Sequence, residues 1–447
     1  YWAFPVVSLG PAVISSHRFQ TGDYYENAYL GSDSLLSVAS IFNVGGSTSF
    51  FNRSTAGSAF IENDVGSTNF FERSTAGTSS ISNNDGTVNF FDNSSAGSAG
   101  FSSFLGGGIA FFDNSTAGNA TMGLLSFEGE AFVRFADSSN AGSATITLRF
   151  GTDIAAVSFE DSSRGGTARI RFDGFPGDRA ILDISAHDAP GVTIGSIEGE
   201  GGDGFLGANN LTVGSNNLST TFPGVIQDGA PFGGGGTGGS LTKIGTGTFI
   251  LTGANTYTGD TNVNRGVLQV DGSITSNTFV NQSGRLAGTG TVNGNLTNNG
   301  RVSPGSAGSP GMLTVTGNYT QAQYATLMIQ LAGANAGEFS VLNILGTANL
   351  SGQLKPVLLN GFLPTVGESF TFLQYGAVNG TLFMFNRNID NLPEHWEVSY
   401  FPTFAVLTVA AGNVPVPDQA STLLLLMLGL SALLMCRQHL VCKTDVN

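Results

Sequence analysis

The fold is decided by a stretch of about 20 residues that repeats between residues 50 and 172. Its copies read FFNRSTAGSAFIENDVGSTN from Phe50, FFERSTAGTSSISNNDGTVN from Phe70, FFDNSSAGSAGFSSFLGGGIA from Phe90 and FFDNSTAGNATMGLLSFEGEAFV from Phe111, with looser copies from Arg134 and Ser158. The steps between copies are 20, 20, 21, 23 and 24 residues. A fixed period of this length indicates a stacked repeat architecture.

Each copy contains short alternating segments, such as SATITL and TARIRF, that end in Asn, Asp, Gly or Ser. Alternation predicts strands, and those residues predict turns. We therefore expect an all-β chain in which each copy forms one coil of a parallel β-helix, because one coil alone cannot bury its apolar face.

Equivalent residues of successive coils then lie above one another, about 4.8 Å apart. The expected interior aromatic ladder is Phe51, Phe71, Phe91, Phe112, Phe135 and Phe159, with Asn93 and Asn114 stacking or capping turns beside it. A constant glycine occurs in every copy, at Gly57, Gly77, Gly97, Gly118, Gly142 and Gly166.

Composition excludes several other classes. Charged residues make up 11% of the 447 residues and the net charge is -15, which argues against a nucleic-acid partner because such proteins need a basic face. Leucine is too scarce before residue 120 for a leucine-rich repeat. A calcium-binding β-roll needs a repeated glycine-rich nonapeptide, and only Gly201–Gly204 comes near it. The two cysteines, Cys436 and Cys442, leave the main body without a disulfide.

The second half of the chain carries a different alternating pattern, SLTKIGTGTFILTGANTYTGDTNVNRGVLQVDGSI, from Ser240 to Ile274. The segments LTKI, TFIL, TNVN and VLQV predict short strands. The expected core residues are Leu241, Ile244, Phe249, Leu251, Val263, Val267, Leu268 and Val270.

These residues resemble the autotransporter-associated β-strand repeat. The positions that carry the resemblance are Leu241–Lys243, Gly245, Gly247–Thr248, Leu251–Gly253, Asn255–Tyr257, Gly259, Thr261, Gly266 and Leu268. The likeness extends over roughly residues 192–350. It implies a right-handed parallel β-helix in an exported protein and implies no particular activity.

Residues 350–411 contain strand-like segments, TLF, WEVSY and FAVLTV, and predict antiparallel strands that cap the solenoid. The expected divisions are 1–49 (a cap or the first coils), 50–191, 192–349, 350–412 (the terminal cap) and 413–447. The chain begins at Tyr1 without a preceding export signal, so we expect a processed or incomplete product.

The C-terminal division contains an apolar run, LLLLMLGLSALLMC at 423–436, followed by Arg437. The run is leucine-rich on every face, and with its flanks it approaches the roughly 17–20 residues that cross a bilayer. We expect a transmembrane helix, with the basic end in the cytoplasm. The alternative is a buried core helix.

This order of motif, helix and basic end resembles a PEP-CTERM-type sorting signal of the variant that opens Val-Pro-Asp. The matching residues are Val416, Pro417, Asp418, Ser421, Thr422 and Arg437. The sequence departs from that variant at Gln419–Ala420 and in the ten residues after Arg437. The resemblance implies export and processing by an exosortase-type membrane enzyme.

Two groups of charged residues are candidates for chemistry. Glu72, Asp92 and Asp113 follow the aromatic pair in three successive copies, and Asp137 and Asp161 lie near the same place. Stacked acids could bind calcium between coils, although acids in an exposed turn are the simpler interpretation. The densest ionisable group would serve a carbohydrate-cleaving enzyme only if it converged in one groove, and a solvated face is again plainer. This group contains Asp153, Glu160, Asp161, Arg164, Arg169 and Arg171, and Arg149 alternates with Arg169 and Arg171 in what could be a small basic stripe on one strand face.

None of the four histidines (His17, His187, His395 and His439) stands in a recognisable order with Ser and Asp, and His187 is expected in a turn. We therefore expect no catalytic residues, cofactor or metal. The sequence predicts an exported structural or adhesive rod that contacts extracellular polysaccharide. The alternatives are a polysaccharide lyase or hydrolase on the same scaffold, or a passenger fragment of a larger adhesin.

Overall fold

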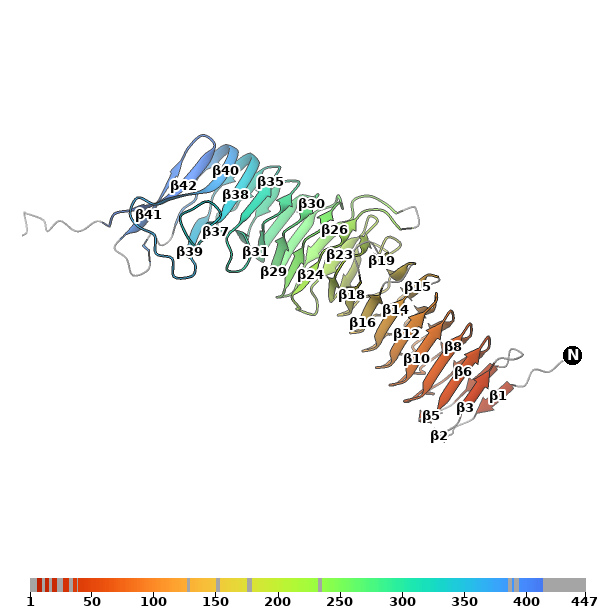
Figure 1. Cartoon of the computed structure of the whole chain (residues 1–447). Helices are drawn as coiled ribbons and strands as arrows, with labels where there is room; N and C mark the ends of the chain where they lie inside the picture. The colour runs from red at the N-terminus through yellow and green to blue at the C-terminus, as the bar shows by residue number, and fades with distance from the viewer. Residues whose placement is uncertain are drawn as a thin grey trace, which may run out of the picture.

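The computed structural model shows an elongated, bent rod of stacked β-strands (Figure 1). It describes residues 6–9, 13–15, 18–21, 27–31, 35–37, 39–126, 129–149, 153–174, 179–231, 235–384, 388–389 and 394–412. Within these ranges the rod consists of strands and turns, and the strands pair in parallel except at the C-terminal end. The prediction of a parallel β-solenoid is confirmed.

Two long sheets form the walls of the N-terminal half. In the described residues, the first sheet contains β1 (Val6–Leu9), β4 (Asn27–Leu30), β7 (Ser47–Phe50), β9 (Ser67–Phe70), β11 (Thr87–Phe90), β13 (Gly108–Phe111), β15 (Ala131–Phe135), β17 (Ala155–Phe159), β19 (Ala180–Asp183), β22 (Asp203–Phe205) and β25 (Val225–Gln227). The second sheet contains β3 (Arg18–Thr21), β6 (Ser40–Val44), β8 (Phe60–Asp64), β10 (Ser80–Asn84), β12 (Gly100–Phe104), β14 (Thr121–Leu125), β16 (Thr145–Arg149), β18 (Arg169–Asp173) and β21 (Ser196–Gly199). A small sheet pairs β2 (Val13–Ser15) with β5 (Leu35–Ser37).

A third long sheet, called here the C-terminal sheet, wraps around the rest of the rod. Its described strands are β20 (Gly191–Ile194), β23 (Asn210–Val213), β24 (Thr220–Phe222), β26 (Ser240–Lys243), β27 (Thr248–Leu251), β28 (Ala254–Asn255), β29 (Thr261–Val270), β30 (Ser273–Ile274), β31 (Thr278–Gly288), β32 (Thr291–Val292), β33 (Leu296–Asn298), β34 (Arg301–Pro304), β35 (Met312–Val315), β36 (Tyr319–Gln321), β37 (Thr326–Leu331), β38 (Val341–Leu350), β39 (Gln353–Leu358), β40 (Ser369–Gly380), β41 (His395–Tyr400) and β42 (Phe404–Ala410).

An aromatic ladder fills the interior of the N-terminal half, but its register corrects the sequence prediction. The fully buried, stacked rings are Phe50, Phe70, Phe90, Phe111, Phe135 and Phe159, with centroids 4.7–5.0 Å apart. Phe51, Phe71, Phe91 and Phe112 form a separate half-buried stack, 4.9–5.1 Å apart. The first phenylalanine of each pair ends an inward-alternating strand, and the second already belongs to the turn.

A buried asparagine ladder lies beside these rings, and it too differs from the prediction. The Asn43 amide donates to Asn63 Oδ1 at 2.7 Å, and Asn63 donates to Asn83 Oδ1 at 3.2 Å. All three side chains are fully buried. The predicted positions, Asn93 and Asn114, are exposed in the turns instead. Satisfied buried amides give the coils a fixed register, because an unpaired one costs free energy.

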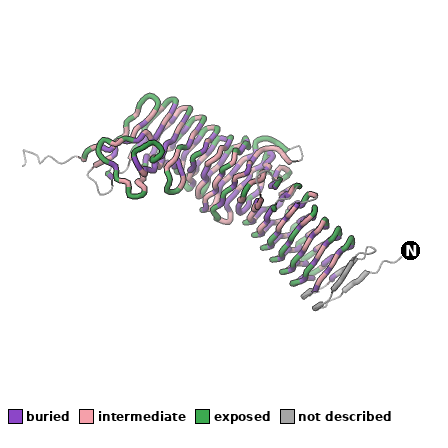
Figure 2. Tube along the Cα trace, viewed as in Figure 1, coloured by how far each residue is buried: buried purple, intermediate pink, exposed green. Residues whose placement is uncertain are grey.

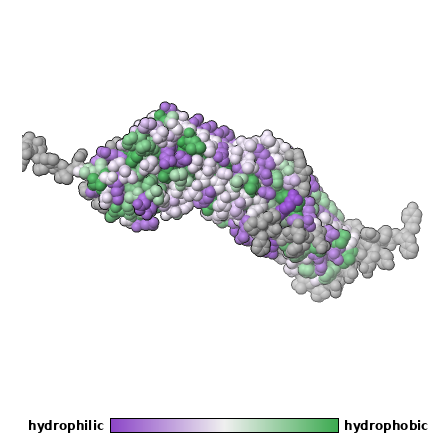
Figure 3. All heavy atoms as spheres, turned by 45° about the horizontal axis from the view of Figure 1, so that its top comes forward, coloured by the Kyte–Doolittle hydropathy of each residue, from purple (hydrophilic) through white to green (hydrophobic). Residues whose placement is uncertain are grey.

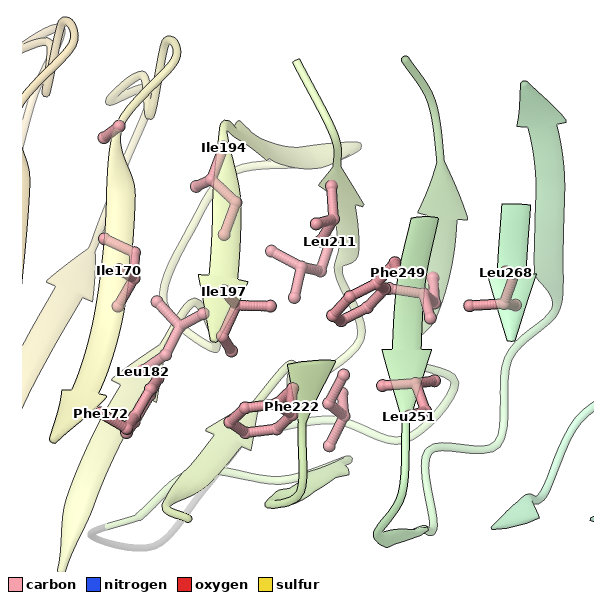
Figure 4. Packing of buried hydrophobic residues seen from close by; sticks show 14 of the residues in the cluster. Ile170, Phe172, Leu182, Ile194, Ile197, Leu211, Phe222, Phe249, Leu251 and Leu268 are labelled. Carbon is pink, nitrogen blue, oxygen red and sulfur yellow. The ribbon is translucent and has the colours of Figure 1, made fainter. Parts of the chain in front are cut away.

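The core continues through the middle of the rod as rows of aliphatic and aromatic side chains, shown for Ile170 to Leu268 in Figure 4. The predicted strands at 241–270 are found as β26, β27 and β29. Six of the eight predicted core residues there are buried, whereas Ile244 and Val267 are only half-buried. Buried and outward positions alternate along each strand, and the pattern repeats from coil to coil (Figure 2).

The C-terminal end is closed by a small antiparallel unit. β42 pairs antiparallel with both β40 and β41, but β39 and β40 pair parallel with β37 and β38. The prediction of antiparallel strands throughout 350–411 is therefore wrong for β39 and for the pairing of β40 with β38, because the parallel stack continues up to Gly380 before the chain reverses.

Among the described residues, no helix is long and apolar enough to cross a membrane. The predicted transmembrane helix falls within residues 413–447, which lie outside the described residues.

Candidate functional site

The acids that follow the aromatic pairs form a ladder along one edge of the rod. Asn52, Glu72, Asp92, Asp113, Asp137 and Asp161 all have a positive φ, between 51° and 60°. Each of the first five donates its backbone N–H to the acidic side chain of the next coil, at N···O distances of 2.6–3.1 Å. These carboxylates thus bond the turns of neighbouring coils together. No group of three or more His, Cys, Asp or Glu in the described ranges is arranged to hold a metal ion.

The densest ionisable group is split between two walls. Glu160 follows β17 of the first sheet, and Arg134 Nη2 donates to it at 2.5 Å. Arg169 and Arg171 project from β18 of the second sheet and pair with Glu198 and Asp173.

The remaining members of the predicted group do not join these pairs. Asp153 and Asp161 accept backbone N–H groups of Gly129 and Asp137, and Arg164 and Arg149 are exposed. The structure therefore does not bring the predicted group together in one groove.

The β18 pairs border a shallow groove where the second sheet ends at β21. This junction groove has a volume of about 380 Å³ and is lined by Arg169, Arg171, Asp173, Glu198, Glu200 and Thr221, among others. The hydrogen bond from Arg169 to Glu198 raises the pKa of the arginine. Each of these two arginines is paired with a carboxylate, and Glu200 adds a further carboxylate to the lining.

Sequence reasoning missed a second acid near Glu160. Asp183, at the end of β19, has a pKa raised by burial, and its carboxylate accepts the backbone N–H of Ser185 at 2.8 Å. Glu160 is held by Arg134 and by Ser158, whose hydroxyl donates to it at 3.2 Å. Both acids therefore have structural partners. The bond between Arg134 and Glu160 was not predicted from the sequence, because the register places Arg134 opposite Ser158 and Glu160 lies two residues further on.

The described histidines also serve local structure. His187 lies in a turn, as predicted, with Nδ1 at 2.6 Å from the Asp188 carbonyl oxygen and Nε2 at 2.7 Å from that of Ser163. His395 contacts Glu397 on β41 at 3.3 Å. His17 and His439 lie outside the described residues.

Lys243 is the least expected interior residue of the chain. It faces inward from β26 in register with Val213 on one side and Val263 on the other, and it is 1% exposed. Its ammonium group donates to the carbonyl oxygens of Ile244 and Arg265, at 2.5 and 3.3 Å. Burial lowers the pKa of Lys243 to about 8. The alternation Leu-Thr-Lys signalled this orientation, since Leu241 and Lys243 share one strand face.

The Asn-Thr-Tyr part of the same repeat is also structural. Asn255 is buried and accepts the backbone N–H of Ile226 at 3.0 Å while it donates to Ser273 O at 3.0 Å. Tyr257 is fully buried, and its hydroxyl lies 2.6 Å from Thr261 Oγ1. Burial raises the pKa of Tyr257 to about 12. These residues of the repeat therefore lie inside the rod, where they form hydrogen bonds within and between coils.

The sorting residues predicted at Val416, Pro417, Asp418, Ser421, Thr422 and Arg437 lie outside the described residues. Two segments of the chain match known family models. Residues 241–270 match the Passenger-associated-transport-repeat, and residues 415–438 match the VPDSG-CTERM motif. Both resemblances drawn from the sequence are confirmed.

Three curated proteins illustrate what the chain is similar to. An "Extracellular serine protease" of Serratia marcescens is 51% identical over 69 residues, which is 15% of this chain and 7% of that protein. The "Adhesin BmaC autotransporter" of Brucella suis biovar 1 (strain 1330) is 32% identical over 159 residues, or 34% of this chain and 4% of that protein. A second "Extracellular serine protease" of Serratia marcescens is 52% identical over 54 residues, or 12% of this chain and 5% of that protein.

The chain thus spans 4–7% of the length of these relatives. Segments of this chain are thus similar to two proteins named as proteases and to one named as an adhesin. This fits a scaffold that occurs in proteins of different activity. The chain is a parallel β-solenoid that contains a passenger-associated transport repeat and a C-terminal VPDSG-CTERM motif.

Proposed function

We propose that this protein is an exported, non-catalytic surface rod that adheres to extracellular polymer or to other cells. The observation that carries the proposal is a row of small polar side chains that repeats from coil to coil on the outside of the rod. The row stacks Thr55, Thr75, Ser95, Thr116 and Asn140 through parallel bridges, and the bridges continue to Leu35 at one end and to Arg164 at the other. The side-chain oxygen of each of these residues accepts the backbone N–H of the glycine two residues further on. The hydroxyl and amide hydrogens of the row then offer weak, equivalent donors, which suits a repetitive polymer.

Further rows on the wall have the same polar character. Asn89 donates to Asn69 at 2.9 Å across neighbouring coils, and the hydroxyl groups of Ser143 and Thr167 lie 2.8 Å apart. Hydrophobic and hydrophilic residues are interspersed over the face shown in Figure 3. The similarity to an autotransporter adhesin supports the same role.

The C-terminal motif supports a route to the surface. We place the apolar run at 423–436 in the membrane as a helix that anchors the chain until an exosortase-type enzyme processes it near Val416–Thr422. The processed rod then belongs to the envelope, the cell surface or the extracellular polymer. The divisions 1–49, 50–191, 192–349, 350–412 and 413–447, and a right-handed winding of the coils, belong to the same proposal.

The alternative is an enzyme on the same scaffold, and the two relatives named extracellular serine proteases favour testing it. The experiment incubates the purified chain with insoluble polysaccharides and with a protein substrate, then measures co-sedimentation, new reducing ends and released peptides. The proposal expects co-sedimentation without cleavage of either polymer. Depolymerisation or proteolysis that tracks the purified chain would establish the enzyme instead.

A further inference from the structure

We propose that a groove at the C-terminal end of the rod, between β38, β40 and β42, is a binding site for a neutral saccharide. This inference rests on the proposed adhesive function and names its ligand class and its location. The groove has a volume of about 460 Å³, and its lining includes Asn343, Leu345, Thr371, Gln374, Thr403 and Phe404. The three strands lie side by side near the end of the rod (Figure 1).

The polar groups of the groove are aligned by strand register. Asn343 of β38 is opposite Gln374 of β40, and Gln374 is opposite Phe404 of β42. Neighbouring strands are about 4.8 Å apart, so two amides and one aromatic ring form a row across the sheet. In the described part of the chain, neither amide side chain has a hydrogen-bond partner within the protein. Each is half-buried and offers two donors and one acceptor.

Two irregularities create the hollow. The register of β38 against β40 shifts between Ile344 and Thr347, and that of β40 against β42 shifts between Thr371 and Leu373. The first shift turns Leu345 outward, where it is 59% exposed. Bulges re-aim side chains and are over-represented next to binding sites. Both of them border this groove, whereas β8 pairs with β10 and β9 pairs with β11 in unbroken register. A further shift in the same sheet, between Val263 and Arg265 of β29, lies away from the groove.

An aromatic pair borders one side, where Phe404 lines the groove and Phe401 stacks on it from outside the lining. The rings of Phe401 and Phe404 stack with centroids 4.6 Å apart, and Phe401 is 44% exposed. The Tyr375 hydroxyl lies 2.8 Å from the carbonyl oxygens of both residues and fixes the turn that carries them. A pyranose has an apolar face and a polar edge. The apolar face fits the rim formed by Leu345 and the two rings, and the hydroxyl edge fits the amides.

Charge decides between a neutral and an acidic saccharide. Every residue that lines the groove is uncharged, in contrast to the junction groove with its arginine and carboxylate pairs. The chain as a whole carries a net charge of -15, which repels an acidic polymer. A neutral oligosaccharide is therefore the occupant that both the lining and the net charge favour.

The test titrates the full chain with cello-, laminari- and manno-oligosaccharides, and with oligogalacturonate as the acidic comparison. The variant Asn343→Ala/Gln374→Ala removes both amides. We expect it to weaken binding of the best neutral ligand about tenfold, as the loss of two hydrogen bonds implies. The matched control is Asn349→Ala/Asn379→Ala. It removes an exposed amide pair, hydrogen-bonded at 3.0 Å, from the same two strands but outside the groove, and it should leave the affinity unchanged.

Three results would overturn the assignment of this groove. The variant Asn343→Ala/Gln374→Ala could bind as tightly as the parent, the control could lose as much affinity as the variant, or oligogalacturonate could bind more tightly than the neutral ligands. If the chain adheres to polymer or cells but these results are obtained, only the assignment fails and the adhesive function stands. If the chain binds no polymer and no cell surface, the proposed function itself fails. Titration with a neutral ligand, followed by NMR, gives a second test that does not depend on affinity. Chemical shift changes confined to Asn343, Gln374 and their neighbours support the site.

Discussion

At the scale of single residues, the solenoid depends on positions in its turns that only glycine can occupy without strain. Gly97 has a φ of 63°, and a Cβ atom there would lie 2.7 Å from the carbonyl oxygen of Gly77 in the preceding coil. The left-handed conformation and the close approach both favour glycine. Because the coils repeat, the same restriction recurs at the equivalent glycines of neighbouring coils, Gly77, Gly118, Gly142 and Gly166.

Gly97→Ala is therefore expected to lower the free energy of unfolding by about 1–3 kcal/mol. The matched control is Gly100→Ala in the same coil, where no atom lies within 4 Å of the added Cβ. That substitution should be neutral or stabilise by about 0.5 kcal/mol, since it restricts the unfolded chain. Urea titrations of the two variants and the parent measure both effects. Equal effects of the two substitutions would contradict the assigned turn.

Lys243 gives a prediction in which pH is varied. Its pKa is about 8 in the folded protein, against an ordinary value of 10.5. Between these two pH values the unfolded chain binds more protons at this position than the folded chain does. Stability from this group therefore rises with pH across that window and is constant below it.

Lys243→Met should remove this contribution, so the stability of the parent relative to the variant should increase from about pH 8 to 10.5. The matched control is Lys355→Met, because Lys355 is exposed on β39. The comparison with the parent cancels the buried tyrosines, which both proteins share. Denaturation curves at several pH values measure it, and a pH-independent difference between the variant and the parent would contradict the buried ammonium.

At the scale of elements, the sequence predicted strands, coils and turns but not which member of each aromatic pair faces inward. Adjacent phenylalanines satisfy either face of a strand, so alternation alone left the choice open. Spacing to the constant glycine resolves it, because Phe90, Phe111 and Phe135 each precede that glycine by seven residues. The same logic explains the asparagine ladder: buried Asn63 lies inside a strand, whereas Asn93 lies in a turn.

Phe90→Ala should consequently cost about 3–5 kcal/mol, as expected for a fully buried ring. Phe91→Ala should cost less than about 2 kcal/mol, because its ring is half-buried and stacks only at the surface. Hydrogen exchange in β9, β11 and β13 should rise more for the first variant than for the second. The reverse order would restore the register that the sequence suggested.

At the scale of the whole molecule, fold class and repeat boundaries were visible in the sequence, whereas the candidate sites were not. Periodicity reports neighbours along a coil axis, so it predicted the stacking of Gly97 on Gly77. It carries no information on bulges, and both bulges that border the C-terminal groove appear only when β38, β40 and β42 pair. The ion pairs of Arg134 with Glu160 and of Arg169 with Glu198 likewise join residues 26 and 29 positions apart, whereas Arg171 pairs with Asp173 on the same strand.

We propose that this rod is exported, sorted by its C-terminal motif and retained at the surface as an adhesive structure. The most direct test is the intact mass of the protein recovered from its own cells after fractionation into cytoplasm, inner membrane, envelope and medium. We expect a species that ends near Val416–Thr422, without the apolar run at 423–436, in the envelope or the medium. An unprocessed chain that remains in the inner membrane or the cytoplasm would contradict it.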